Sequence, residues 1–243
     1  MNRRLYALHR WISLLAFLQL VAWTTSGAFF VLVPIERVRG AGVPGAHDAS
    51  FDEHLATLAP ASALAVAAAA GVSGATQLEL RPGRAGALYY VVRAGEKTLR
   101  LDARTGARAP VEQAEAEATA RRDQPGSPAV AAVQRVEDLR TEYRGKPLPA
   151  WRVLLRDEAG TAVYVDATTG DVTARRNDVW RTYDWLWSLH IMDYRERESF
   201  NHPLIMAAAL LAVATVLSGA ALWILRLARR VSRRGRQERA PAG

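Results

Sequence analysis

Two long apolar blocks lie near the ends of the chain. Neither the block Trp11–Val33 nor the block Leu204–Leu225 contains an ionisable side chain. At ~1.5 Å of rise per residue, a helix of either length spans about 30 Å, which is the thickness of the hydrocarbon core of a bilayer. The pattern predicts two transmembrane helices, with residues 34–202 between them as a separate, more polar domain.

Between these blocks the hydrophobic period changes from that of a helix to that of a strand. The alanine-rich segment Ser62–Ala70 predicts a helix that ends at Gly71. Polar and apolar residues then alternate, with Pro and Gly turn residues between the runs, which predicts strands over 76–81, 87–93 and 97–103. We expect a helix followed by a three-stranded antiparallel sheet.

The same order recurs in the second half of this domain. Val111–Arg122 is a charged helical segment, and strands are expected over 151–157 and 161–167. The segment Ala129–Arg144 fits either a helix or a strand with a bulge. The two halves also end alike, since Leu-Asp-Ala-Arg-Thr-Gly closes the first and Val-Asp-Ala-Thr-Thr-Gly closes the second. An Asp followed by Thr-Gly makes a tight turn without any chemistry.

The predicted fold class is therefore an α+β membrane protein, in which two transmembrane helices flank an extracytoplasmic domain of two similar helix-plus-antiparallel-sheet units. The expected segments are a cytoplasmic N-terminus (1–10), a first transmembrane helix (11–33), a first unit with its linker (34–110), a second unit (111–177), an interfacial aromatic segment (178–202), a second transmembrane helix (203–227) and a basic cytoplasmic tail (228–243).

The distribution of charge predicts the orientation. Of 32 basic and 24 acidic residues, ten arginines and one glutamate lie in the tails, so 22 basic and 23 acidic residues nearly cancel elsewhere. Under the positive-inside rule, both termini lie in the cytoplasm and the central domain in the periplasm of a bacterial inner membrane. The tail arginines are expected to contact the lipid bilayer, and no basic stripe with interleaved aromatic residues indicates nucleic acid as a partner.

Several kinds of chemistry are excluded by the sequence. The absence of cysteine removes disulfides, thiolate metal sites and cysteine nucleophiles. There is no phosphate-binding loop, dinucleotide fingerprint, nucleophile motif or His-Glu-x-x-His helix. The sequence therefore does not predict an enzyme acting on its own. His47 and His54, with acidic neighbours, are expected to be solvated rather than to bind a metal.

Three of the five histidines lie at predicted membrane borders: His9, His190 and His202. A neutral imidazole there can ligate haem iron. His9 and His202 are predicted at opposite faces, about 30 Å apart, so they cannot hold one haem within one chain. His190 and His202 lie on the same side and can converge, within one chain or across a dimer. His190 belongs to the aromatic segment 178–202, which is expected to be an amphipathic helix on the outer leaflet.

Two sets of residues resemble a known family. Tyr164-Val165-Asp166 followed by Thr169-Gly170-Asp171-Val172 is similar to the strand and turn of the PepSY domain. Leu8-His9-Arg10-Trp11 with Ser26-Gly27, and Leu189-His190 followed by Ser218-Gly219 and Trp223, resemble the PepSY-associated transmembrane proteins. The resemblance covers nearly the whole chain and implies two PepSY-like units between two helices.

The resemblance implies three alternative functions. The first is a membrane-anchored PepSY-like module that binds or regulates another envelope protein, linked to iron uptake or a redox system. The second is a subunit of the ferric-siderophore reductase type, which carries electrons on haem b held by His9, His190 and His202. Such reductases use more membrane helices, so this chain would need a homo-dimer or a partner subunit. The third is a protease-inhibiting module.

Overall fold

Two long helices confirm the expectation of an apolar helix at each end of the chain. The computed structural model describes residues 3–40, 57–83, 86–138 and 142–237, which divide into two units. The helical unit combines residues 3–33 with 183–237, and the sheet unit contains the described part of residues 34–182. His47 and His54 lie outside the described residues.

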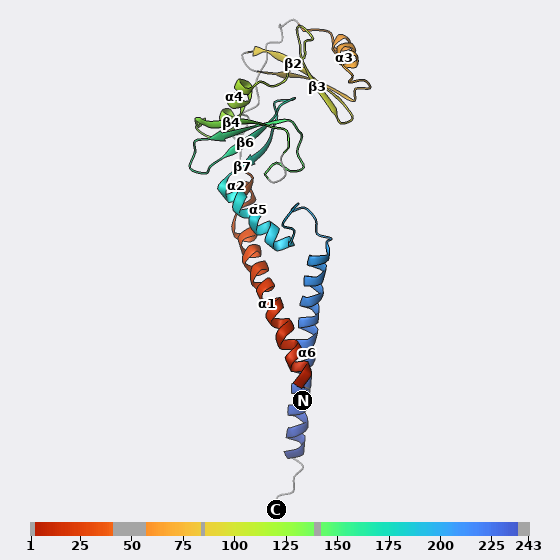
Figure 1. Ribbon diagram of the computed structural model, residues 1–243, viewed down its shortest axis with the longest axis vertical. Helices are drawn as coiled ribbons and strands as arrows, with labels where there is room; N and C mark the ends of the chain where they lie inside the picture. The colour runs from red at the N-terminus through yellow and green to blue at the C-terminus, as the bar shows by residue number, and fades with distance from the viewer. Residues whose placement is uncertain (1–2, 41–56, 84–85, 139–141, 238–243) are drawn as a thin grey trace, which may run out of the picture. The chain divides into compact units, whose positions relative to one another are not determined.

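The helical unit is built on α1 (Arg3–Leu32) and α6 (Pro203–Gln237), which pack against each other. Their segments His9–Leu32 and Pro203–Arg230 are long and apolar enough to cross a membrane. Figure 1 shows the two helices closest near the N-terminus and further apart at the other end. Many large apolar side chains on both helices are exposed, as expected of a surface in lipid: Leu15, Leu18, Leu210 and Val216.

The aromatic segment before α6 differs from the expectation. The helix α5 (Asp178–Ile191) ends eleven residues before His202, rather than continuing to it. The rings of Tyr183 and Trp187 pack against Phe30 of α1, with centroids 4.6 and 5.9 Å apart. Protein, rather than lipid, therefore covers this face of the helix, and only some aromatic residues, such as Trp185, remain exposed.

The first half of the sheet unit matches the predicted helix and three-stranded sheet. After the short helix α2 (Ile35–Arg39), α3 (Pro60–Ala69) lies beside an antiparallel sheet. The strands run in the order β1 (Gln77–Pro82), β2 (Leu88–Ala94) and β3 (Lys97–Asp102). The alternating sequence turns one face of this sheet towards α3, where buried residues form a core: Ala63, Ala67, Leu88, Tyr90, Val92, Leu99 and Leu101.

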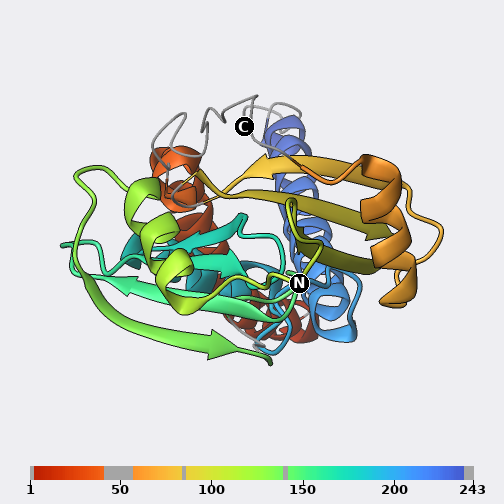
Figure 2. The ribbon, with the colours of Figure 1, turned by 90° about the horizontal axis from the view of Figure 1, so that it is seen from above.

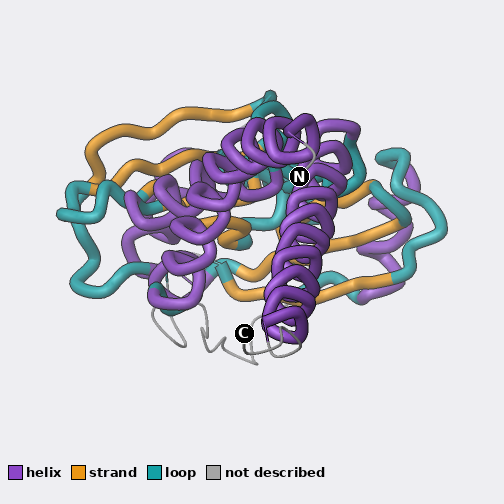
Figure 3. The backbone as a smooth tube through the Cα atoms, turned by 90° about the horizontal axis from the view of Figure 1, so that it is seen from below, coloured by secondary structure: helices purple, strands orange, loops and turns teal. Residues whose placement is uncertain are grey.

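The second half contains the two predicted strands and two more. The helix α4 (Gln113–Asp123) packs on a four-stranded antiparallel sheet (Figure 2). Figure 3 marks the strands of the chain in orange. The strands run in the order β4 (Val130–Val136), β5 (Ala150–Leu155), β6 (Ala162–Asp166) and β7 (Val172–Arg176). The ambiguous segment Ala129–Arg144 thus contains a strand, and its register shifts between Val130 and Ala132. The strand β7 was not predicted.

The shared turn motif performs the local function expected of it. The Oδ1 atom of Asp102 accepts hydrogen bonds from the backbone N–H groups of Arg104 and Thr105, at 3.0 and 2.8 Å. Asp166 accepts the equivalent bonds from Thr168 and Thr169, at 2.7 and 2.8 Å. In each turn the following glycine has a positive φ, +75° at Gly106 and +85° at Gly170.

A pair of tyrosines occupies the far side of the second sheet from α4. The rings of Tyr143 and Tyr164 stack with centroids 4.6 Å apart, and Tyr164 is fully buried. The Tyr164 hydroxyl donates to Glu142 at 2.9 Å and accepts from Arg152 at 3.2 Å. Burial raises the pKa of Tyr164 to about 12, and the charge of Glu142 adds to this effect.

We predict that the sheet unit loses stability at alkaline pH through Tyr164. A phenol whose pKa is raised from 10.0 in the unfolded chain to about 12 in the folded one stabilises fully below pH 10, and this contribution is lost as the pH rises towards 12. The loss amounts to about 3 kcal/mol. Unfolding of the full chain, followed against pH, should show this dependence in the wild type and in the exposed control Tyr194→Phe. The prediction fails if Tyr164→Phe loses stability over the same range just as steeply.

Candidate functional site

The alternation of the first sheet gathers its charged residues on one face. Val91 of β2 pairs with Glu79 of β1 and with Arg100 of β3, so these three residues lie on the face of the sheet opposite α3. Val91 is completely buried although its neighbours are charged, so this face is covered by other parts of the sheet unit. The polar residues of this face are Gln77, Glu79, Arg81, Tyr89, Arg93, Thr98, Arg100 and Asp102.

The helix α4 forms the opposing wall. Ala116 and Ala120 are fully buried in the core of the second sheet. Glu115, Thr119 and Arg122 follow at helical spacing on a different face. This face is turned towards the first sheet, because Glu115 contacts Arg100 of β3. One side of α4 therefore faces the core of the second sheet, and another side faces the space between the two sheets.

A buried ion pair joins these walls. The guanidinium of Arg100 donates two hydrogen bonds to the carboxylate of Glu115, at 2.6 and 3.1 Å. The side chains are only 3% and 17% exposed. The Tyr89 ring lies 3.5 Å from the guanidinium carbon of Arg100, in a cation–π contact. A Cβ atom on Gly83 would approach Cε2 of Tyr89 to 2.0 Å, so only glycine fits beside this ring.

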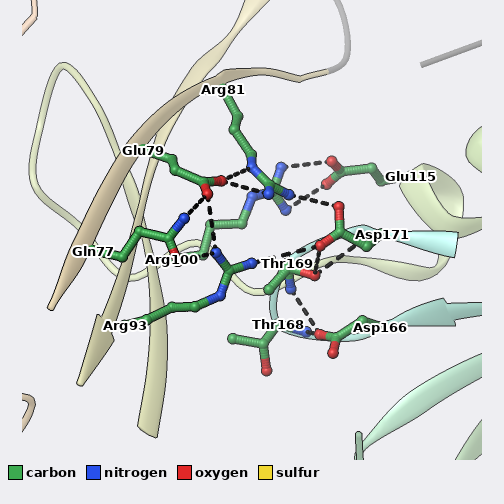
Figure 4. A network of polar contacts seen from close by, with 10 residues as sticks. All are labelled: Gln77, Glu79, Arg81, Arg93, Arg100, Glu115, Asp166, Thr168, Thr169 and Asp171. Carbon is green, nitrogen blue, oxygen red and sulfur yellow. Dashed lines mark hydrogen bonds and ion pairs between the residues drawn. The ribbon is translucent and has the colours of Figure 1, made fainter. Parts of the chain in front are cut away.

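A second set of charges bridges the first sheet to the turn between β6 and β7. Figure 4 shows Arg81 between Glu79, on its own strand, and Asp171 in that turn. Arg81 donates to them at 2.5 and 2.6 Å. Arg93 contacts the same two carboxylates, at 3.1 and 3.8 Å. Burial lowers the pKa of Arg81, but the charges of Asp171 and Glu79 outweigh it and raise the pKa, so the network remains charged.

The walls enclose a cleft with a volume of about 530 Å³. It is bordered by β1–β3, by α4, and by residues 169–172 and 175 of the second sheet. At its edge, Arg175 makes a double hydrogen bond to Asp123, which is completely buried. The charged lining consists of four arginines and two carboxylates: Arg81, Arg100, Arg122, Arg175, Glu115 and Asp171. The cleft is therefore positively charged.

The chemistry of this cleft is that of binding. Its two carboxylates are held by arginines, and no histidine or cysteine borders it, so it lacks a nucleophile with an adjacent base. Among the described residues, no three His, Asp or Glu side chains gather as a metal site. Arginines in fixed positions instead recognise carboxylate and phosphate oxygens.

The predicted site residues lie elsewhere, in the helical unit. His190 of α5 contacts α1: its Nδ1 lies 2.7 Å from the Ser26 hydroxyl, and its ring lies 5.5 Å from that of Phe30. Ser26 is fully buried and donates its own proton to the carbonyl of Ala22. The hydroxyl therefore accepts a hydrogen bond from Nδ1–H of His190, and Nε2 keeps its lone pair.

His9, near the start of α1, makes a similar contact with α6. Its Nδ1 lies 2.7 Å from the hydroxyl of Ser218 on α6, which donates to the carbonyl of Thr215. Ser13 contacts Nε2 at 3.4 Å. His9 also borders an open groove of about 1210 Å³ whose walls come from α1. His190 contacts α1 at Ser26, which lies seventeen residues after His9 on that helix. Seventeen residues span about 25 Å along a helix, so His9 and His190 do not meet.

His202 has a different environment. Its Nε2 donates to the backbone carbonyl of Ile191, at 2.9 Å, and so ties the start of α6 to the end of α5. The structure thus places His190 and His202 near the same helix end, but each ring already has its own hydrogen-bond partner. None of the three predicted histidines belongs to the arginine-lined cleft.

Comparison with known proteins identifies one family. The family model described as the PepSY-associated TM region matches residues 6–241. No curated protein and no solved structure matches the chain.

We predict that the Ser26 hydroxyl stabilises the contact between α1 and α5. Ser26→Ala removes the acceptor for His190 in a buried position, which should lower the free energy of unfolding by about 1 kcal/mol. Thermal unfolding of the full chain in mild detergent measures the change. Thr25→Ala is the matched control, because Thr25 is exposed on the same turn. Equal stability of the two variants would mean that the hydrogen bond contributes nothing.

Proposed function

This chain belongs to the PepSY-associated TM region family, and on that premise we propose that it is a membrane-anchored module that binds and regulates another protein of the bacterial envelope. It is a membrane protein with two candidate spans in contact with lipid. We place it in the inner membrane, with both termini in the cytoplasm and the sheet unit in the periplasm. The excess of arginine in both tails supports this orientation.

The observation that carries this proposal is the arginine-lined cleft between the two sheets. A binding site needs a concave surface with polar groups held in fixed positions. The Arg100–Glu115 pair and the contacts of Arg81 hold the walls of the cleft in this way. The volume of about 530 Å³ lies in the range of ligand sites. The absence of a nucleophile with an adjacent base among the cleft residues favours binding over catalysis.

The repetition within the sheet unit supports its interpretation as two PepSY-like units. Each half has a helix, an antiparallel sheet and the same Asp-containing turn, at Asp102 and at Asp166. The resemblance of this chain to the PepSY-associated transmembrane proteins suggests a partner in iron uptake or in a redox system. The role of a protease inhibitor remains a prediction of that resemblance, because no contact in the structure favours it.

We predict that a partner crosslinks at the edge of the cleft. The chain has no cysteine, so Ala118→Cys, one turn before Arg122 on α4, gives a single attachment point for a photoreactive maleimide. Irradiation of labelled full-length protein in its native membranes should give a discrete adduct.

The matched control is Ala61→Cys, an exposed alanine on α3, which lies on the opposite side of the first sheet. Mass spectrometry of the adducts identifies the partner. A yield from Ala118→Cys no greater than that from Ala61→Cys would contradict the proposal.

A second candidate function is electron transfer on haem b, and one observation favours it. His9 and His190 each donate Nδ1–H to a serine on a neighbouring helix, at 2.7 Å. A second partner of this kind orients histidines that ligate metals. It leaves Nε2 of His190 available for the iron, whereas Nε2 of His9 lies 3.4 Å from the Ser13 hydroxyl, which a haem would have to displace. Because the two rings lie about 25 Å apart along α1, they would serve two separate haems.

The fit of these residues to haem is partial within one chain. The groove beside His9 has walls from α1 alone, so a second wall must come from another molecule. Each site would take a second histidine from a second copy or a partner subunit. Bound haem would supply one-electron chemistry, and the chain would position the ring through His9 or His190.

We predict for this candidate a haem spectrum that depends on two of the three histidines. The full chain, purified in mild detergent from haem-supplemented cells, should show a Soret band that shifts on reduction with dithionite. His9→Ala and His190→Ala should each lose part of it. His202→Ala is the control, because its Nε2 is already bonded to the Ile191 carbonyl. A colourless wild type would exclude the haem candidate and leave the binding module untouched.

A further inference from the structure

Three hydrogen-bond donors that border the cleft have no partner among the described residues. The hydroxyl of Thr119 forms no hydrogen bond there, although this residue is only 5% exposed. The Tyr89 hydroxyl and the Arg122 guanidinium, within the same described ranges, also make no hydrogen bond or ion pair. Arg122 is exposed, Tyr89 is half-buried, and Thr119 borders the cleft, so all three groups are available to donate hydrogen bonds to a ligand that enters it.

The acceptors of the cleft are already in use. Glu115 receives two hydrogen bonds from Arg100, and Asp171 receives one from Arg81 and one from the hydroxyl of Thr169. Burial raises the pKa of Tyr89, and the charges of Glu115 and Asp102 add to this effect, so its hydroxyl keeps its proton. What the cleft still offers to a ligand is therefore N–H and O–H groups.

The charge of the residues that line the cleft favours the same kind of ligand as its open hydrogen-bond donors. Of the four arginines that border the cleft, Arg81, Arg100 and Arg175 are paired with carboxylates. Arg122 has no carboxylate partner among the described residues, so it leaves a positive charge that an anion can neutralise. Thr119 and Arg122 lie three residues apart on α4, which places their side chains next to each other on one face. Tyr89 approaches from β2 across the cleft. Donors on two walls can thus surround a single anionic group.

Resting on the proposed function, we propose that this cleft binds an oxyanion, a phosphate or carboxylate group, through Arg122, Thr119 and Tyr89. Arginine bonds such oxygens with good geometry, and the two hydroxyl groups complete the contacts. The anion belongs either to a small molecule or to acidic groups of the partner protein. The two sources share this chemistry and differ in whether a free anion competes with the partner.

The test is anion-dependent thermal stability of the full chain in mild detergent. Potassium phosphate and potassium succinate are titrated against potassium chloride at matched ionic strength. A bound ligand stabilises the folded state in proportion to its occupancy, so the wild type should show a saturable rise in Tm. Arg122→Gln and Thr119→Val should each weaken the apparent affinity about tenfold, the cost of losing one hydrogen bond to a charged group.

Arg108→Gln is the matched control, because it removes the same charge from an exposed residue that does not border the cleft. It should respond like the wild type. Tyr89→Phe, which keeps the ring over Arg100 and loses only the hydroxyl, should also bind more weakly. Equal shifts in all variants, or no shift beyond that in chloride, would overturn the proposal.

The crosslinking experiment separates this inference from the proposed function. If saturating phosphate abolishes the adduct at Ala118→Cys, the oxyanion belongs to the partner; if the adduct persists while phosphate binds, the anion is a small molecule. An adduct without any anion-dependent shift leaves the binding module in place and overturns the oxyanion. An anion-dependent shift without an adduct supports the oxyanion site and contradicts the protein partner.

Discussion

The buried ion pair between Arg100 and Glu115 is the constraint on which the sheet unit depends. It joins a strand of the first sheet to the helix that covers the second, and the Arg100 side chain is only 3% exposed. Removing either partner would leave a buried charge uncompensated, which costs about 3–5 kcal/mol. The pair therefore holds α4 opposite the polar face of the first sheet, and the cleft lies between these two surfaces.

Around this pair, charged side chains join the two halves of the sheet unit. Arg81 and Asp171 make a further link between the two halves, at 2.6 Å, and Arg175 closes the edge on the buried Asp123. Guanidinium groups suit this role because they donate several hydrogen bonds in one plane. A lining of this kind stays open to anions, whereas apolar packing would have filled the same space.

The helical unit is held together by different interactions. In lipid, apolar surface gives little driving force for helices to associate, so polar contacts and close packing have to position them. His9 with Ser218 links α1 to α6, and His190 with Ser26 links α1 to α5. These histidines therefore have a structural role in joining the helices.

The sequence alone determined the features that repeat over short distances. The apolar blocks around α1 and α6, the alternation of β1–β3 and the turns at Asp102 and Asp166 each follow from neighbouring residues. It did not reveal β7, whose short polar sequence is a strand only because β6 pairs with it. Nor did it reveal the cleft, although arginine at alternate positions of the strands was visible. Arg100 meets Glu115, and Arg81 meets Asp171 ninety residues away, only after both sheets have formed. Tertiary packing decided the site, because it brings together charges that no local period relates.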